Sequence, residues 1–150
     1  MSDYDSTQDT LDHIKKVRAR LQECIGQLEA RSWVHDKSKL QSPEKEAFDK
    51  VTPLRRGLTY GSPEYRANTA RLGDALKHHY AENSHHPEHY PNGIEGMSLL
   101  DIMEMLCDWK AASERHADGD IARSIQINRE RFGITEQLVS ILENTVRELR

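Results

Sequence analysis

The apolar residues near the start of the chain recur at steps of three and four positions. They are Leu11, Ile14, Val17, Leu21, Ile25 and Leu28. Because an α-helix turns once in about 3.6 residues, this spacing places them on one face and predicts an amphipathic helix over residues 9–30. A second, shorter helical segment with Trp33, Val34, His35 and Asp36 is predicted to end near Leu40.

Serine–proline pairs and glycines predict where the later helices begin and end. Serine caps a helix, proline fits its first turn, and glycine commonly follows its last turn. Ser98 and Asp101 resemble a capping box, with Asp101 in place of the preferred glutamate or glutamine. The later predicted helices cover residues 43–51, 63–80, 98–116, 121–132 and 134–149, with an irregular loop at 52–63, a His-rich loop at 83–96 and a break at 118–120.

The pattern contains no run of alternating apolar and polar residues that would predict a strand. A chain of 150 residues is long enough for one buried core. We therefore expect an all-α protein, a single domain over 1–150 that forms an irregular bundle of about six to seven helices. Residues 1–8 are expected to be flexible.

Charge and hydropathy exclude two classes of partner. The net charge of −4 predicts no basic surface for polymeric nucleic acid. No apolar run approaches the ~20 residues of a membrane span, and the polar first residues lack the pattern of a signal peptide. We therefore expect a cytoplasmic protein that binds neither nucleic acid polymers nor membranes.

Cysteine suggests no site, whereas histidine does. Cys24 and Cys107 are far apart and form no CxxC pair, so we expect two buried small apolar residues. Histidine occurs eight times, and five of these residues lie between His78 and His89. This concentration requires an explanation.

Two histidines on predicted helices lie toward apolar faces, and a third is followed by an acid. His13 projects within about 40° of Val17, and His79 within about 60° of Leu72, at 100° per residue. His79 is thus expected to face inward and His78 to face water. Each inward histidine is either a satisfied core residue or a metal ligand. His35 and Asp36 form an adjacent imidazole and carboxylate, which suits a divalent metal.

The His-rich loop and the helix after it add further donors. His85, His86 and His89 lie in the loop, which is either a solvated turn or a set of converging ligands. Asp101, Glu104 and Asp108 follow at steps of three and four, so they share one stripe of a helix. Apolar neighbours are expected to draw Asp108 inward, where an ionised acid needs a partner. That partner is a metal or an arginine such as Arg115.

The order of these motifs resembles the HD superfamily of metal-dependent phosphohydrolases. The run His-Asp-Lys-Ser-Lys at 35–39 is similar to the His-Asp-x-Gly-Lys form of the HD-GYP branch, with Ser38 in place of glycine. His85-His86 followed by residues 90–96 resembles that branch's His-His-Glu, Gly-Tyr-Pro and Gly-Leu-x-Gly run, although Pro87 replaces the glutamate and His89 the glycine. A closer resemblance is to small HD-like proteins with an Asn-x-His-His-Pro-Glu-His core and a Glu-Met-Leu-Cys-Asp-Trp helix, here residues 83–89 and 104–109. The resemblance covers about 13–112.

The resemblance implies a fold of HD-domain type and a role for each matching residue. The implied metal ligands are His13, His35, Asp36, His79, His85, His86 and Asp108. They would hold one or two divalent ions (Mn, Mg, Fe, Co, Ni or Zn), with Asp36 as the bridge between two. The implied catalytic residues are Asp36, Lys39 and Glu104, where Glu104 orients a histidine, activates water or is a surface acid. The candidates for substrate contact are Lys39, His89, Arg55 and Arg56.

The implied function is hydrolysis of a nucleotide or another small phosphoester by water that a metal activates. Two alternatives remain open. One is a di-iron oxygenase on the same scaffold, because iron takes the same histidine and carboxylate ligands. The other is a non-catalytic helical module that binds metal. A homodimer through the last helix is the alternative to packing of that helix in the chain's own core, which we favour.

Overall fold

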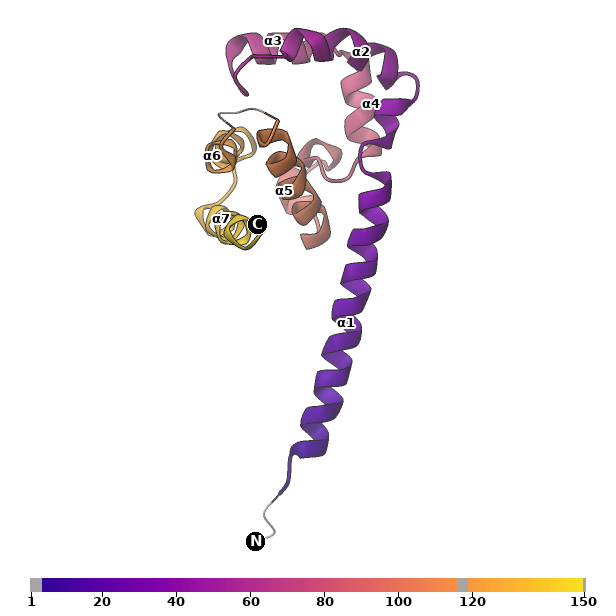
Figure 1. Ribbon diagram of the computed structural model, residues 1–150, viewed down its shortest axis with the longest axis vertical. Coiled ribbons are helices and arrows are strands. Elements are labelled where there is room, and N and C mark those ends of the chain that lie inside the picture. Colours follow the sequence, from indigo (N-terminus) through magenta and orange to yellow (C-terminus); the bar gives the residue numbers. More distant parts are fainter. Residues whose placement is uncertain (1–3, 116–118, 150) are drawn as a thin grey trace. The chain divides into compact units, whose positions relative to one another are not determined.

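The computed structural model describes residues 4–115 and 119–149, and these contain helices but no strand (Figure 1). The seven α-helices of this part of the chain confirm the all-α fold with about six to seven helices. They are α1 (Thr7–Val34), α2 (Glu44–Arg55), α3 (Pro63–Ala70), α4 (Asp74–Glu82), α5 (Leu99–Ser113), α6 (Ile121–Phe132) and α7 (Glu136–Glu148), with 3₁₀-helices η1 (Lys37–Leu40), η2 (Pro87–His89) and η3 (Gly93–Gly96). The expected helix end at 116 and the start of the break at 118 lie outside the described residues.

The chain divides into two units, Met1–Val34 and His35–Arg150. The first unit contains α1, whose apolar row is 42–58% exposed from Leu11 to Ile25. The prediction of a separate segment at Trp33 is wrong, because α1 continues through this residue and ends at Val34. Of the residues expected to be flexible, 1–3 lie outside the described part, and α1 already begins at Thr7, whose backbone N–H donates to Asp5 Oδ1.

The second unit has its apolar core among α5, α6 and α7. The buried residues of this core are Met105, Leu106, Trp109, Ile125, Ile134, Val139 and Leu142. Met105 and Leu106 are each 1% exposed, and burial of such a side chain contributes about 1.5–3 kcal/mol. The last helix thus packs in the chain's own core, as favoured from its apolar pattern. The core residues of α5 fix this helix against α6 and α7, while Glu104 and Asp108 on the same helix reach the candidate site.

Helices α2 and α4 pack against one another and against η1. The sequence predicts one helix over 63–80, but the structure has a break between α3 and α4. Gly73 forms this break with a φ of 53°, a backbone conformation that residues with a Cβ rarely adopt. Pro53 lies inside α2, so the irregular loop begins later than expected, after Arg55.

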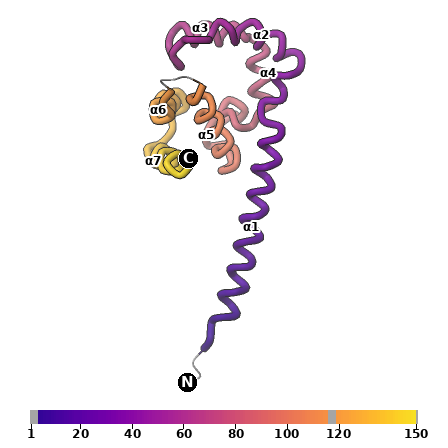
Figure 2. The backbone as a smooth tube through the Cα atoms, in the orientation of Figure 1, coloured from indigo at the N-terminus to yellow at the C-terminus, as the bar shows by residue number. Residues whose placement is uncertain are grey.

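The chain between α4 and α5 makes a tight turn through η2 and η3 (Figure 2). Asp101, which is 3% exposed, fastens this turn to α5 by accepting from Ser84 Oγ at 2.8 Å and from Tyr90 Oη at 2.9 Å. The same carboxylate completes the predicted capping box with Ser98. Gly96 is required by a close approach, because a Cβ there would lie 2.7 Å from Tyr90 Cβ.

Cysteine exposure corrects the expectation from the sequence. Cys24 and Cys107 are both exposed rather than buried. Each lies on an exposed face of its helix, α1 for Cys24 and α5 for Cys107, so residue type alone does not predict its burial.

Across the described residues, no helix combines the length and the apolar character needed to cross a bilayer.

Candidate metal centre

His35 and Asp36 form the sharp turn that precedes η1. Asp36 has a φ of 56°, a left-handed conformation that aspartate and asparagine tolerate better than most residues. The turn leaves His35 Nε2 3.6 Å from Asp36 Oδ2. The adjacent imidazole and carboxylate thus face the same point.

Imidazole nitrogens and carboxylate oxygens converge at this point. His79 Nε2 lies 2.9 Å from His86 Nε2 and 3.4 Å from Asp36 Oδ1. His85 Nε2 lies 3.6 Å from the same Asp36 oxygen. Together the Asp36, His79, His85 and His86 donor atoms all lie within 4.8 Å of one another.

A second group of donors adjoins the first. His35 Nε2 lies 3.7 Å from Asp108 Oδ1, and His35, Asp36 and Asp108 form another set that could hold an ion. Asp108 is therefore drawn toward the centre, as expected. The described residues contain no ion pair between Asp108 and Arg115, although both line the same cavity.

Glu44 contacts the His79 ring at Nδ1, on the opposite side from the Nε2 that faces the centre. Its side chain is fully buried, and Oε2 lies 2.8 Å from His79 Nδ1 while it accepts from Ser38 Oγ at 2.9 Å. An ionised carboxylate only accepts hydrogen bonds, so His79 Nδ1 carries the proton and its Nε2 presents a lone pair. Glu44 thus selects the tautomer that a metal requires.

Glu104 performs the same task for two other rings. Its Oε1 lies 2.9 Å from His35 Nδ1 and 3.2 Å from His85 Nδ1. Both rings therefore direct Nε2 to the centre. Three roles were open for Glu104: to orient a histidine, to activate water or to be a surface acid. This geometry fits the first.

Two buried acceptor atoms identify the point where a cation fits. Among the described residues, the buried atoms Asp36 Oδ1 and His85 Nε2 have no hydrogen-bond partner. An unsatisfied buried polar atom is costly, and here two lie side by side. Nitrogen and oxygen donors of this kind suit a divalent transition metal, so the residues fit the ion that the HD resemblance implies.

The surroundings shift the protonation of the rings in opposite directions. Burial lowers the pKa of His79, His85 and His86, so these rings are neutral near pH 7. The Asp108 carboxylate beside Nε2 raises the pKa of His35 to about 9, against the effect of burial and with help from Glu104. His35 therefore carries the proton that a metal would displace.

The two carboxylates of the centre stay ionised. Burial favours the neutral form of Asp108, but the adjacent His35 and the charge of Lys39 together outweigh burial and lower its pKa. Burial acts on Asp36 in the same way, and the charge of Lys39 lowers its pKa. Lys39 Nζ donates to Asp36 Oδ2 and lies 5.0 Å from the centre of the Phe48 ring.

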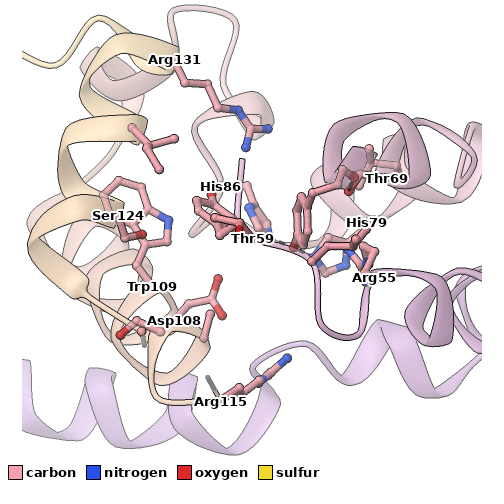
Figure 3. Close-up of a pocket in the computed structure, with 18 of the residues that line it drawn as sticks. Arg55, Thr59, Thr69, His79, His86, Asp108, Trp109, Arg115, Ser124 and Arg131 are labelled. Atoms are coloured by element: carbon pink, nitrogen blue, oxygen red, sulfur yellow. Dashed lines mark hydrogen bonds between the residues drawn. The ribbon is translucent and has the colours of Figure 1, made fainter. Parts of the chain in front are cut away.

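A cavity of about 500 Å³ adjoins these donors (Figure 3). This volume lies in the range of small-molecule sites. Donors, cations and rings share its lining. The donors are Asp36, His79, His86 and Asp108; the basic residues are Lys39, Arg55, Arg115, Arg123 and Arg131; and the aromatic residues are Phe48, Tyr60, Tyr65, Tyr80, Trp109 and Phe132.

Three residues proposed from the sequence lie elsewhere. His13 is exposed on α1 in the first unit and belongs to none of the donor sets that the described residues form. Arg56 and His89 are exposed and do not line the cavity, and His89 Nδ1 lies 2.9 Å from the backbone oxygen of Tyr80. Their functional roles stay predictions. The orientations of His78 and His79 agree with expectation, because His79 is 2% exposed and the His78 side chain 41%.

Glu44 is a site residue that no motif in the sequence marks. An acid in the first turn of a helix is usually explained by the helix dipole, and Glu44 follows Pro43 at such a position. Ser38 and Asn83 are within the recognised motifs but were given no role. Asn83 Nδ2 donates to Ser38 Oγ at 2.9 Å, which holds Ser38 against Glu44.

A comparison with protein families matches residues 2–148 to DUF5662, described as a family of unknown function. The chain belongs to this family. Searches of curated proteins and of solved structures found no match to this DUF5662 chain. The features that bear on the function of this member are its donor cluster and cavity.

Proposed function

We propose that the chain is a metal-dependent phosphohydrolase of HD type that acts on a nucleotide or another small phosphoester. The observation that carries the proposal is the pair of unpartnered buried atoms, Asp36 Oδ1 and His85 Nε2, within converging histidine and aspartate donors. The adjoining cavity gives a small substrate access to that point. A cytoplasmic location and independence from nucleic acid polymers are predictions from the sequence alone.

The residues have distinct tasks in this proposal. His35, Asp36, His79, His85, His86 and Asp108 would hold the metal. A divalent ion there would supply Lewis acidity, lower the pKa of a water ligand and neutralise phosphoryl charge. Glu44 and Glu104 are positioning residues, because each acts through the histidines whose Nδ1 it faces.

Lys39 is the candidate for direct contact with the substrate phosphate. Its ammonium group is held beside the donors by Asp36 and over the Phe48 ring, and it lines the cavity. A compact positive charge suits a phosphoryl oxygen. Hydrolysis then joins a water oxygen to phosphorus as the bond from phosphorus to the ester oxygen breaks, and the leaving oxygen gains a proton.

The first test compares wild type with Asp36→Asn. Asparagine tolerates the left-handed backbone at this position, so the variant removes the carboxylate while it retains the turn. Asp49→Asn is the matched control, because Asp49 is exposed and its ion-pair partner is the exposed Lys45, at 2.7 Å. Metal content by elemental analysis and phosphate release from a nucleotide and phosphoester panel are measured for all three proteins.

We expect near-stoichiometric metal and phosphate release in wild type and Asp49→Asn, and loss of both in Asp36→Asn. Wild-type protein that binds no divalent metal would refute the proposal. Bound iron with oxygen-dependent turnover and no phosphate release would replace it with the di-iron oxygenase. Bound metal without turnover of any kind would favour the non-catalytic module.

A further inference from the structure

Arg55 is a half-buried cation with aromatic rings around it. It ends α2 and lines the cavity on the same side as His79 (Figure 3). Its Cζ lies 5.9 Å from the centre of the Phe48 ring and 5.6 Å from that of Tyr65. These rings attract the guanidinium but do not neutralise it.

The described residues provide Arg55 with no carboxylate partner, which sets it apart from the other cations that line the cavity. Lys39 pairs with Asp36 and Arg131 pairs with Glu88, both at 2.5 Å. Arg115 and Arg123 are exposed, so water screens their charge. A partly desolvated guanidinium without an acid is the position at which a ligand anion gains most.

Arg55 lies close enough to the metal donors for one small molecule to reach both. The centre of the Phe48 ring is 5.7 Å from that of His79 and 5.9 Å from Arg55 Cζ. These two distances set an upper limit on the separation of Arg55 from the His79 ring. A phosphoryl group at the donors already has a cation beside it in Lys39, which pairs with Asp36, so Arg55 is available to a second group of the same molecule.

We propose that Arg55 forms a second anion subsite, so that the ligand of this cavity carries two oxyanionic groups joined by a spacer. The inference rests on the proposed function for the identity of the first group, the phosphoryl group at the metal donors. The second group, a phosphate or a carboxylate, binds to the guanidinium through paired N–H donors. The flanking rings reduce access of water and so strengthen that ion pair.

Calorimetric binding to the full chain tests the subsite with three probes. The probes are a hexose monophosphate, the bisphosphate of the same hexose, and the sugar acid with one phosphate and a carboxylate at its far end. The proteins are wild type, Arg55→Gln, Arg55→Lys and the control Arg71→Gln, since Arg71 is exposed and does not line the cavity. Metal content and thermal unfolding are measured for each protein.

Wild type and Arg71→Gln should bind a two-anion probe about 10–100-fold more tightly than the monophosphate, as expected for charge-assisted hydrogen bonds. Arg55→Gln should abolish that preference without weakening the monophosphate, and Arg55→Lys should retain part of it. A preference for the bisphosphate alone identifies the second group as a phosphate. A preference for both two-anion probes shows that either oxyanion can bind there.

Equal affinity of wild type for all three probes, or an unchanged preference in Arg55→Gln, would overturn the subsite. Equal weakening of every probe in Arg55→Gln would mean that Arg55 contacts the phosphate common to all probes or acts structurally, and either reading would also overturn it. If Arg55→Gln does not fold, the wild-type ratio and Arg55→Lys decide. A preference that depends on Arg55, without phosphate release, would support the subsite and reject the hydrolase. Phosphate release without any preference would support the hydrolase and reject the subsite.

Discussion

Replacement of Glu44 by glutamine tests whether this buried carboxylate prepares the metal centre. The carboxylate receives contacts at 2.8 Å from His78 Nδ1 and His79 Nδ1 and at 2.9 Å from Ser38 Oγ. Glutamine has nearly the same shape, but it has one acceptor oxygen and no charge. With that oxygen toward His79 and Ser38, the amide NH₂ faces His78, whose half-exposed ring can turn to water.

The cost follows from the loss of charge at the retained bonds. Hydrogen bonds to an ionised group contribute about 1.5–3 kcal/mol, and those between neutral groups about 0.5–1.5 kcal/mol. Weakening of the bonds to His79 and Ser38 therefore removes about 2–3 kcal/mol from the free energy that holds the His79 ring in place. Since 1.4 kcal/mol equals about a factor of ten, metal affinity should fall about 10–100-fold, as is typical for partners of metal-binding histidines.

Competition with a chromophoric chelator measures this affinity. Glu46→Gln is the matched control, because Glu46 lies in the same first turn of α2 and is exposed. Unfolding in the presence of excess chelator separates a loss of metal affinity from a loss of intrinsic stability. Glu44→Gln protein that binds metal within about twofold of wild type would refute the argument that Glu44 orients His79.

Two further predictions concern His35 and Asp101. In metal-free protein the pKa of His35 is raised from 6.5 to about 9, so its stabilising effect is complete below pH 6.5 and is lost as the pH rises through about 9. Denaturant titrations should show that loss in wild type but a level response in His35→Gln; a similar loss in both would contradict it. Asp101→Asn should reduce the free energy of unfolding by about 1–3 kcal/mol, because it weakens the bonds from Ser84 and Tyr90 to a buried carboxylate. A change below about 0.5 kcal/mol in thermal unfolding, no larger than for an exposed control such as Glu95→Gln, would show that Asp101 does not fasten the turn.

Local signals in the sequence predict much of the fold. Ser62 caps α3 by accepting from the Tyr65 backbone N–H, and Ser98 and Asp101 form the expected capping box. Gly133 ends α6 in the left-handed conformation that glycine favours. These features depend on residues three or four positions apart, so a pattern in the chain is sufficient to reveal them.

Features that depend on packing between distant segments are harder to predict. The sequence offers Arg55 and Arg56 as equal candidates, but α2 ends between them and Arg56 has extended backbone at a ψ of 131°. Arg55 therefore reaches the cavity while its neighbour is exposed. Glu44 has the local pattern of a surface acid, and its role arises from α4, which brings His79 against it.

The structure brings most of the candidate ligands in the HD-like motifs together in one cluster, but the motifs do not predict the geometry of that cluster. His35, Asp36 and His79 come together with the His-rich turn and α5, as the resemblance implies, while His13 lies in the other unit. The sequence could not reveal which ring nitrogen faces the centre. That choice depends on Glu44, which lies 35 positions from His79, and on Glu104, which lies 69 positions from His35.

The order of the donors along the chain has a consequence for biosynthesis. The turn at His35 and the rings of His79, His85 and His86 precede α5, which supplies Glu104 and Asp108. A nascent chain whose α5 has not yet left the ribosome thus has its histidines but lacks two acids. These are Glu104, which orients His35 and His85, and Asp108, the last carboxylate of the cluster. Because the donor set is incomplete without Glu104 and Asp108, an ion bound as we propose would have all of its ligands only after α5 docks. Metal loading would then mark chains whose synthesis has passed this helix, and a ribosome stalled before it would carry an incomplete site.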